Sequence, residues 1–171
     1  MSSYSISYNA NLRSLYNEDR RLGTKAGRKD AENTTLIAGD IKALNRGLKN
    51  IGRYDFGTSD TDTKDEKTAF YKNLKAVMDT YNNSIETTSK SENPQVKKVS
   101  KRLAKLASKY EDELGDVGIS IDKKGYMTIS ESAVDNYDVS RFKKVFGDDS
   151  DFMKEFKKYT KNLSNHIDEY A

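Results

Sequence analysis

The sequence predicts a mainly helical protein, an elongated antiparallel helical bundle or coiled-coil hairpin that carries one small β-hairpin at about residues 117–130. Three observations lead to this fold class. Apolar residues recur at spacings of three and four along most of the chain. Only 35% of the 171 residues are hydrophobic while 33% are charged, which favours narrow apolar seams over a thick globular core. A single stretch changes to an apolar period of two, and the total length favours one domain.

The predicted β-hairpin consists of two short runs in which apolar and polar residues alternate, so that Ile119 and Ile121 share a face. The polar turn between the runs ends in Gly125, which can adopt the positive φ that a short hairpin turn needs. Because two strands of this length are not stable alone, we expect them to rest on the helices, against residues 106–114. The residues assigned to the hairpin are Gly118, Ile119, Ile121, Asp122, Gly125, Met127 and Ile129.

Three helices are expected before the hairpin. The first begins at about Asp30, and its apolar residues have the spacing of a helix that packs lengthwise on another. The second begins with the capping-box spacing of Thr63 and Glu66 and ends before Pro94, which forces the preceding residue out of the helical region. Pro94 then opens the third helix, and Gly115 caps it. A short polar connection makes the second and third helices an antiparallel pair, against which the first helix lies.

Each helix carries one apolar stripe that we expect to form its seam. In the first helix the stripe is Ile37, Ile41, Leu44, Leu48 and Ile51. In the second and third helices the seam residues are Phe70, Leu74, Val77, Tyr81, Ile85, Val99, Leu103, Leu106 and Tyr110. After the hairpin we expect two short helices, followed by a final helix that begins at Asp149 or Ser150. Its stripe is Phe152, Phe156, Tyr159, Leu163, Ile167 and Tyr170.

Three segments are expected to lack regular structure. Residues 1 to about 10 are polar without a sustained period, which predicts disorder. Residues 58–63 are dense in turn formers and predict a loop. Residues 23–28 contain glycines and cations but match no phosphate-binding fingerprint, so they predict a flexible linker.

The chemistry of the side chains argues against an enzyme. The sequence contains no Cys and a single histidine, His166, so a zinc site would need carboxylates for every other ligand. We therefore expect His166 to lie at the surface or at the rim of the core. The turn at Asp122 places Gly at its fourth position and Lys at its third, which excludes an EF-hand calcium loop. No nucleophile elbow is present. The sequence thus predicts no cofactor, no metal and no catalytic residues, and no run is apolar and long enough to span a membrane.

A cationic face is predicted on the third helix, at Lys97, Lys98, Lys101, Arg102, Lys105 and Lys109. The net charge of +3 arises from mostly interspersed charges, so such a face is most simply a solvated surface. It could also meet phosphates or an acidic partner. Nucleic acid is disfavoured because no RNA-binding aromatic motif or helix-turn-helix signature accompanies it. An alternative function is nevertheless a cytoplasmic helical adaptor or nucleic-acid-associated protein that uses the face from Lys97 to Lys109.

The segment Leu114-Gly-Asp-Val-Gly-Ile-Ser-Ile-Asp-Lys-Lys-Gly-Tyr-Met-Thr-Ile-Ser-Glu131, with the later run Phe142-Lys-Lys-Val-Phe146, resembles the C-terminal region of the bacterial flagellar filament-capping protein family (hook-associated protein 2). In that family a helix ends in a Gly-Ile-Thr-like strand, and an Asp-x-x-Gly turn, a second strand, a short helix and a Val-x-x-Leu-Phe-like element follow. Upstream, the run Ala76-Val-Met-Asp-Thr-Tyr-Asn82 is similar to the family's Phe-Val-x-x-Tyr-Asn helix. The matching positions of the C-terminal segment are Gly118, Ile119, Asp122, Gly125, Ile129 and Phe146.

The resemblance covers about residues 64–150 and implies the helical leg domain of a cap protein. It departs from the family in two respects. Only residues 57–62 stand where cap proteins insert large β-rich domains, and the long terminal helices of the family are abbreviated or missing. The implied function is a non-enzymatic structural or assembly protein that contacts itself, flagellar subunits or an export chaperone. The implied location is the extracellular flagellum if the chain is exported by the flagellar route, and the cytoplasm otherwise.

Overall fold

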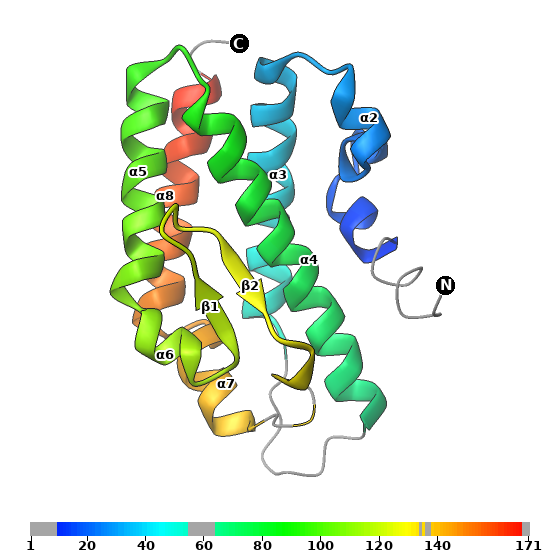
Figure 1. Ribbon diagram of the computed structural model, residues 1–171, viewed down its shortest axis with the longest axis vertical. Coiled ribbons are helices and arrows are strands. Elements are labelled where there is room, and N and C mark those ends of the chain that lie inside the picture. The colour runs from blue at the N-terminus through cyan, green and yellow to red at the C-terminus, as the bar shows by residue number, and fades with distance from the viewer. Residues whose placement is uncertain (1–9, 55–63, 134, 136–137, 169–171) are drawn as a thin grey trace.

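The computed structural model describes residues 10–54, 64–133, 135 and 138–168, and it confirms the mainly helical fold class with one two-stranded sheet. Four long helices, α3 (Asn33–Gly52), α4 (Lys64–Ser89), α5 (Pro94–Lys109) and α8 (Asp151–Asp168), form an elongated up-down-up-down bundle (Figure 1). Each packs on two antiparallel neighbours in the cyclic order α3, α4, α5, α8. The predicted antiparallel pairing of α4 with α5 is confirmed, and of these two helices α3 packs on α4. Helix α8 closes the ring by packing on both α3 and α5.

Shorter elements lie outside this ring. The N-terminal arm, which we define as residues 10–29, runs along the outside of α3 (Figure 1). The β-hairpin lies across α4 and the lower part of the α5–α6 side (Figure 1). In chain order the remaining elements are a helical turn at residues 10–15, η1 (Arg20–Gly23), α2 (Lys25–Lys29), α6 (Glu111–Gly115), β1 (Ile119–Ile121), β2 (Met127–Ile129), η2 (Glu131–Ala133) and α7 (Val139–Phe146).

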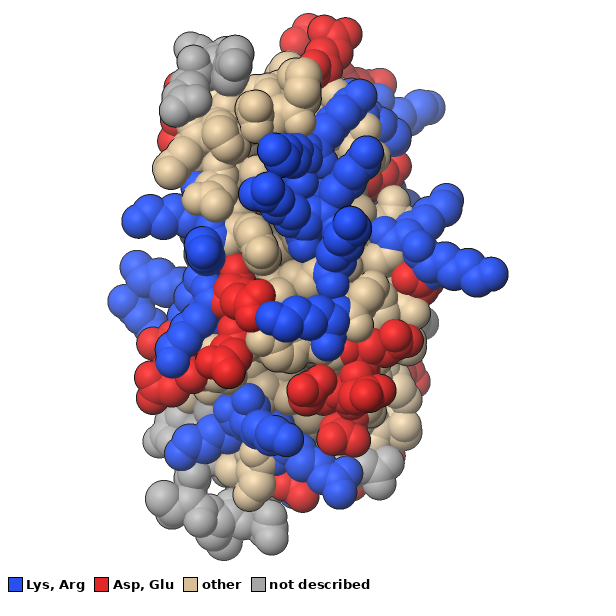
Figure 2. All heavy atoms as spheres, turned by 90° about the vertical axis from the view of Figure 1, so that its left-hand side faces the viewer, with Lys and Arg blue, Asp and Glu red and all other residues tan. Residues whose placement is uncertain are grey.

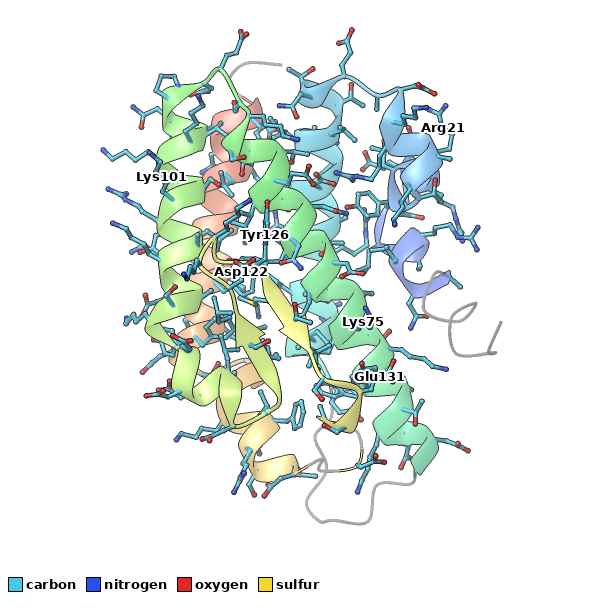
Figure 3. The ribbon with its side chains drawn as sticks, viewed as in Figure 1. Arg21, Lys75, Lys101, Asp122, Tyr126 and Glu131 are labelled. Atoms are coloured by element: carbon cyan, nitrogen blue, oxygen red, sulfur yellow. The ribbon has the colours of Figure 1, made fainter. Side chains whose placement is uncertain are left out.

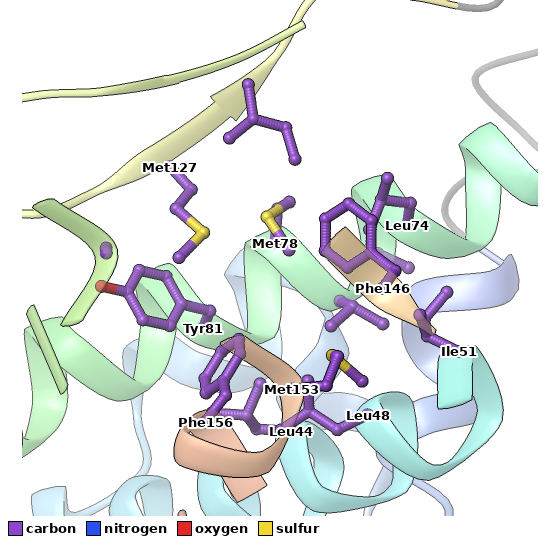
Figure 4. Packing of buried hydrophobic residues seen from close by; sticks show 14 of the residues in the cluster. Leu44, Leu48, Ile51, Leu74, Met78, Tyr81, Met127, Phe146, Met153 and Phe156 are labelled. Carbon is purple, nitrogen blue, oxygen red and sulfur yellow. The ribbon is translucent and has the colours of Figure 1, made fainter. Parts of the chain in front are cut away.

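The core follows the predicted stripes. Every stripe residue of α3 is buried, and so are all the seam residues of α4 and α5 except Tyr110, which is half-buried. Figure 4 shows how side chains from α3, α4, α8 and the hairpin converge on the bundle axis. Aromatic rings connect the helices edge to face: the ring centroids of Tyr81 and Phe156 lie 5.6 Å apart, and those of Phe70 and Phe142 lie 5.3 Å apart.

Two glycines in α3 allow its neighbours to approach closely. A Cβ at Gly39 would lie 2.5 Å from Cδ1 of Leu22, and a Cβ at Gly47 would lie 2.7 Å from Cγ2 of Val77. Gly39 thus accommodates the N-terminal arm and Gly47 accommodates α4. Each glycine costs α3 up to about 1 kcal/mol of helix propensity relative to Ala, and closer packing of the neighbouring element offsets that cost.

The prediction of one continuous third helix ending at Gly115 is wrong. Helix α5 stops at Lys109, and Tyr110 leaves the helical region with φ −107° and ψ 23°. The short helix α6 then continues through Gly115, and the left-handed residue is Gly118, with φ of 81°. The break turns α6 toward β1, and Leu114 is fully buried there.

Several predicted segments need correction or lie outside the described residues. The expected flexible linker at residues 23–28 is wrong, because Gly23 ends η1, Thr24 caps α2 and residues 25–28 belong to α2. Residues 1–9 of the expected disordered stretch, the loop at residues 58–63, Thr63 of the capping box and Tyr170 of the last stripe lie outside the part that the structure describes. The start of α5 is as expected: Oδ1 of Asn93 accepts a hydrogen bond from the backbone N–H of Gln95 at 2.9 Å, and Pro94 follows as the first helical residue.

Candidate functional site

The β-hairpin has an inward and an outward face, as the alternation predicts. In the antiparallel register Ile119 is opposite Ile129 and Ile121 is opposite Met127, so all four side chains share one face. Ile119, Met127 and Ile129 are buried, with 1%, 2% and 7% of their surface exposed, and Ile121 is half-buried. The outward pair, Ser120 and Thr128, is exposed.

Asp122 organises the turn of the hairpin. Its Oδ1 accepts hydrogen bonds from the backbone N–H groups of Lys124 at 2.8 Å and Tyr126 at 2.9 Å. Its carbonyl accepts one from the N–H of Gly125, whose φ of 85° only glycine adopts readily. A Cβ at Gly125 would lie 2.8 Å from the Cβ of Ala104, so the turn is in close contact with α5. The carboxylate of Asp122 therefore serves the backbone of its own loop, at the position labelled in Figure 3.

Helix α4 holds the hairpin through two adjacent side chains, Tyr81 and Asn82. The hydroxyl of Tyr81 donates to the carbonyl of Gly125 at 2.7 Å. The amide of Asn82 donates from Nδ2 to the carbonyl of Met127 at 2.8 Å and accepts at Oδ1 from the N–H of Met127, also at 2.8 Å. Burial raises the pKa of Tyr81 above its ordinary value, and the nearby charge of Asp122 raises it further.

The hairpin packs on a different surface from the one that the sequence predicted. Strand β2 lies on α4, and β1 lies on α6 at residues 111–115, so the predicted region 106–114 accounts for only part of the contact. The sequence singled out Tyr81 as a seam residue but gave Asn82 no role beyond the similarity of its motif. Asn82 is recognisable as a polar residue next to an apolar stripe, and only the fold shows what it binds.

A second polar cluster, which we call the Asp40 cluster, fixes the N-terminal arm to α3 and α4. Asp40 is fully buried, and Arg28 forms a two-pronged ion pair with it, at 2.7 Å to Oδ1 and 3.0 Å to Oδ2. The hydroxyl of Tyr16 donates to Oδ1 at 2.7 Å, and the hydroxyl of Thr87 donates to Oδ2 at 2.8 Å. Nδ2 of Asn83 donates to the Tyr16 hydroxyl at 3.0 Å. The charge of Asp40 is thus fully compensated, as a buried carboxylate requires.

The pKa values of Tyr16 and Arg28 reflect the buried, charged environment of the Asp40 cluster. Burial raises the pKa of Tyr16 well above its ordinary value, and the charge of Asp40 raises it further. Burial alone would lower the pKa of Arg28, but its hydrogen bonds to Asp40 and the charge of that carboxylate outweigh it, so the pKa of Arg28 is raised. Both groups keep their ordinary protonation states at neutral pH. No pattern in the sequence predicted this cluster.

The predicted cationic face of α5 is present and exposed. Side chains of Lys and Arg gather over α5 in the upper half of the surface in Figure 2. Lys109, at the lower end of the helix, is paired with Glu155 at 2.6 Å. Within the described residues, the other five cations make no ion pair; they are Lys97, Lys98, Lys101, Arg102 and Lys105.

Among the cavities lined by described residues, two contain half-buried titratable side chains, and neither brings together a set of catalytic groups. One, of about 680 Å³, lies between the N-terminal arm and α4 and is lined in part by Lys75, Asp79 and Asn83. Burial raises the pKa of Asp79 to about 6 and lowers that of Lys75. The other, of about 750 Å³, lies at the end of the bundle, and the half-buried His166 lines it beside Ile167. Among the described residues no three His, Cys, Asp or Glu side chains come together as metal ligands.

Comparisons with known proteins give no assignment: no family model, no curated protein and no solved structure matches this chain. A search of the described helices for a membrane span, by length and hydropathy, finds none.

Proposed function

We propose that this chain is a non-enzymatic, flagellar-cap-like structural or assembly protein that works through contacts with other protein chains. The observation that supports this proposal most is the pairing of Asn82 with Met127 across 45 residues. The two segments that carry the resemblance to the cap family, the Tyr-Asn helix and the β-hairpin, are each other's direct binding partners. A chance likeness of two short motifs would not require them to meet.

The chemistry of the site is consistent with a scaffold. Three polar groups form hydrogen bonds within the fold itself: the Asp40 cluster, the carboxylate of Asp122 and the amide of Asn82. The described residues present exposed charge and an exposed hairpin face, which are suited to binding another macromolecule. The partners implied by the resemblance are a second copy, flagellar subunits or an export chaperone.

The alternative partner for the basic face, nucleic acid, is less well supported. A surface that follows a polyphosphate is positive along its length. Here the basic residues of α5 are followed directly by four carboxylates, Glu111, Asp112, Glu113 and Asp116. Those carboxylates would repel a phosphate backbone that ran along the helix.

The proposal can be tested by locating the chain in its own cells. We expect an epitope-tagged chain to accumulate with sheared flagellar filaments or in the medium, and to be retained in the cell when the flagellar export apparatus is disrupted. The Asn82→Ala variant should lose co-purification with its flagellar partner, while Asn50→Ala, an exposed asparagine of α3, should retain it. A chain that stays in the cytoplasm of export-competent cells, and that cross-links to no flagellar protein, would contradict the proposal.

A further inference from the structure

The exposed face of α5 and α6 is divided into a basic half and an acidic half. The basic half consists of Lys97, Lys98, Lys101, Arg102 and Lys105, all exposed on α5. The acidic half consists of Glu111, Asp112, Glu113 and Asp116, of which only Glu113 is half-buried. Within the described residues, no member of either half forms an ion pair. The fold therefore leaves both sets of charges available.

The two halves lie on the same side of the molecule, one below the other. Figure 1 places α6 directly below α5 at one edge of the bundle. In the view onto that edge, basic side chains gather in the upper half and acidic side chains lie below them, with further basic side chains at the lower end of the surface (Figure 2). Lys101 points away from the bundle in Figure 3, toward the viewer of Figure 2. The cations from Lys97 to Lys105 extend over about 12 Å of helix.

We propose that this face binds a second copy of the chain in an antiparallel dimer, so that the basic half of each copy lies on the acidic half of the other. A two-fold axis perpendicular to the face, passing between the halves, brings opposite charges together twice. This inference rests on the proposed function only in that it names the chain itself as one of the protein partners. It does not depend on a flagellar location.

The charge distribution favours a second copy over a uniformly charged partner. A polyanion would satisfy the basic half and be repelled by the acidic half, and a polycation would do the opposite. A partner that carries an acidic and a basic region in the reverse order attracts the basic half and the acidic half at the same time. A copy of this chain turned by 180° provides that order.

The junction between the halves is suited to lie on the axis. Ser108 is a small, exposed residue at the end of α5. The next cation, Lys109, is already neutralised by Glu155 at 2.6 Å, so like charges do not meet at the centre. Residues near a two-fold axis contact their own counterparts, which makes Ser108 a reporter of the arrangement.

The dimer should be weak and strongly dependent on salt, because the charges that form it are exposed. At low ionic strength we expect sedimentation velocity to detect a dimer that dissociates as salt rises. Between about 20 mM and about 500 mM salt the dissociation constant should increase by on the order of ten-fold or more.

A charge-swap experiment tests the pairing. The triple variant K98E/K101E/R102E leaves only Lys97 and Lys105 as cations in the basic half and makes the net charge of that half negative. The variant E111K/D112K/D116K leaves only Glu113 as an anion in the acidic half and makes the net charge of that half positive. Each variant alone should be monomeric at low salt because like halves repel. Their equimolar mixture should form a heterodimer at least as readily as the unmodified chain. Circular dichroism and thermal unfolding check that each variant is folded.

A cross-linking experiment tests the symmetry. The chain contains no Cys, so a single substitution gives an unambiguous readout. Under mild oxidation at low salt, S108C should form a disulfide-linked dimer, and high salt should prevent it. N50C, at an exposed position of α3, the helix that lies across the ring from α5, is the matched control and should stay monomeric.

Three results would overturn the inference. The unmodified chain could be monomeric at every salt concentration, the two swapped variants could fail to associate when mixed, or N50C could cross-link as well as S108C. If the chain is monomeric but binds duplex DNA or RNA, and K98E/K101E/R102E alone abolishes that binding, the face is a nucleic-acid interface. A monomer that still co-purifies with flagellar filaments would refute the dimer while leaving the proposed function intact.

Discussion

Asn82 and Met127 are joined by two hydrogen bonds of 2.8 Å each, one in each direction, so that a side-chain amide of α4 pairs with the backbone of β2 as a neighbouring strand would. The two strands of the hairpin are three residues long and would not hold together by themselves. This amide, with the Tyr81 hydroxyl beside it, gives the hairpin a fixed position on the bundle.

Removal of the Asn82 amide should loosen the hairpin. The Asn82→Ala variant leaves the N–H and carbonyl of Met127 without their partners, which we expect to cost about 2 kcal/mol of unfolding free energy. Urea unfolding measures the loss, and amide hydrogen exchange should show that residues 119–129 lose protection before the long helices do. Asn50→Ala removes the same group from an exposed position and should change stability by less than about 0.5 kcal/mol. Equal losses in both variants would contradict this assignment.

The hairpin should also be an integral part of the core. Ile119→Asp places a carboxylate where the native side chain is 1% exposed, and we expect a loss of about 3 kcal/mol or more in the whole domain. Ser120→Asp changes the adjacent, outward-facing residue and should have little effect. Thermal unfolding followed by circular dichroism compares the two. Unchanged melting of Ile119→Asp would show that the hairpin is peripheral.

Arg28 should be essential for docking of the N-terminal arm. In Arg28→Ala, Asp40 keeps its hydrogen bonds from Tyr16 and Thr87 but loses the guanidinium that pairs with it while it stays fully buried, so we expect about 3 kcal/mol of destabilisation. Limited proteolysis should then cut the arm faster than the bundle. Arg21→Ala removes an exposed cation whose partner is Asp19, and it should leave both readouts almost unchanged.

Asp79 should make stability depend on pH in a recognisable direction. Its pKa is about 6 in the folded chain because burial disfavours the charge, against 3.8 for the ordinary group. The folded state therefore binds the proton more tightly, so this contribution to stability is complete below about pH 4 and is lost as pH rises through about 6. For a fully buried group, the difference between these two pKa values corresponds to about 3 kcal/mol of unfolding free energy. Asp79 is in partial contact with water, which reduces the expected contribution to about 1–2 kcal/mol.

The Asp79→Asn variant isolates this effect. It should be more stable than the unmodified chain at pH 7 by about 1–2 kcal/mol, and the advantage should vanish near pH 4. Urea unfolding at a series of pH values measures the difference in unfolding free energy between the two proteins. The contributions of the other carboxylates are the same in both proteins and cancel in this difference. Asp65→Asn, an exposed position on the same helix, should show no such trend. An advantage that is independent of pH would contradict the assignment to Asp79.

The sequence predicted the elements that have a regular period, and it failed where contacts are not periodic. The stripes of α3, α4 and α5 and the alternation of the hairpin depend on spacing alone, and these are confirmed. Asp40 lies on the same side of α3 as the apolar stripe, three residues after Ile37 and next to Ile41, which could have marked it as a buried charge. Its partner Arg28, however, lies among glycines that predicted a linker. The ion pair forms only because the arm folds back on α3, and no local pattern records that.

The break at Tyr110 was missed for a related reason. The spacing of Tyr110 and Leu114 continues the helical stripe, so a single sequence favours one unbroken helix. In the fold, the Tyr110 hydroxyl donates to Glu155 at 2.9 Å, and its ring lies 5.4 Å from that of Phe152. Contacts with α8, which is distant in the sequence, determine where α5 ends. The candidate site at Tyr81 and Asn82 likewise depends on a hairpin 45 residues away.

The amide of Asn82 has a further consequence for the fate of the chain in a crowded cell. A two-stranded sheet has two open edges, and the free N–H and C=O groups of an edge strand can recruit strands from other molecules and begin aggregation. The N–H and C=O of Met127 point outward from β2, and Asn82 occupies both. Helix α4 thus acts as a cover on this edge, and the hairpin can present its polar outer face at the surface without offering β2 as a template for fibrils.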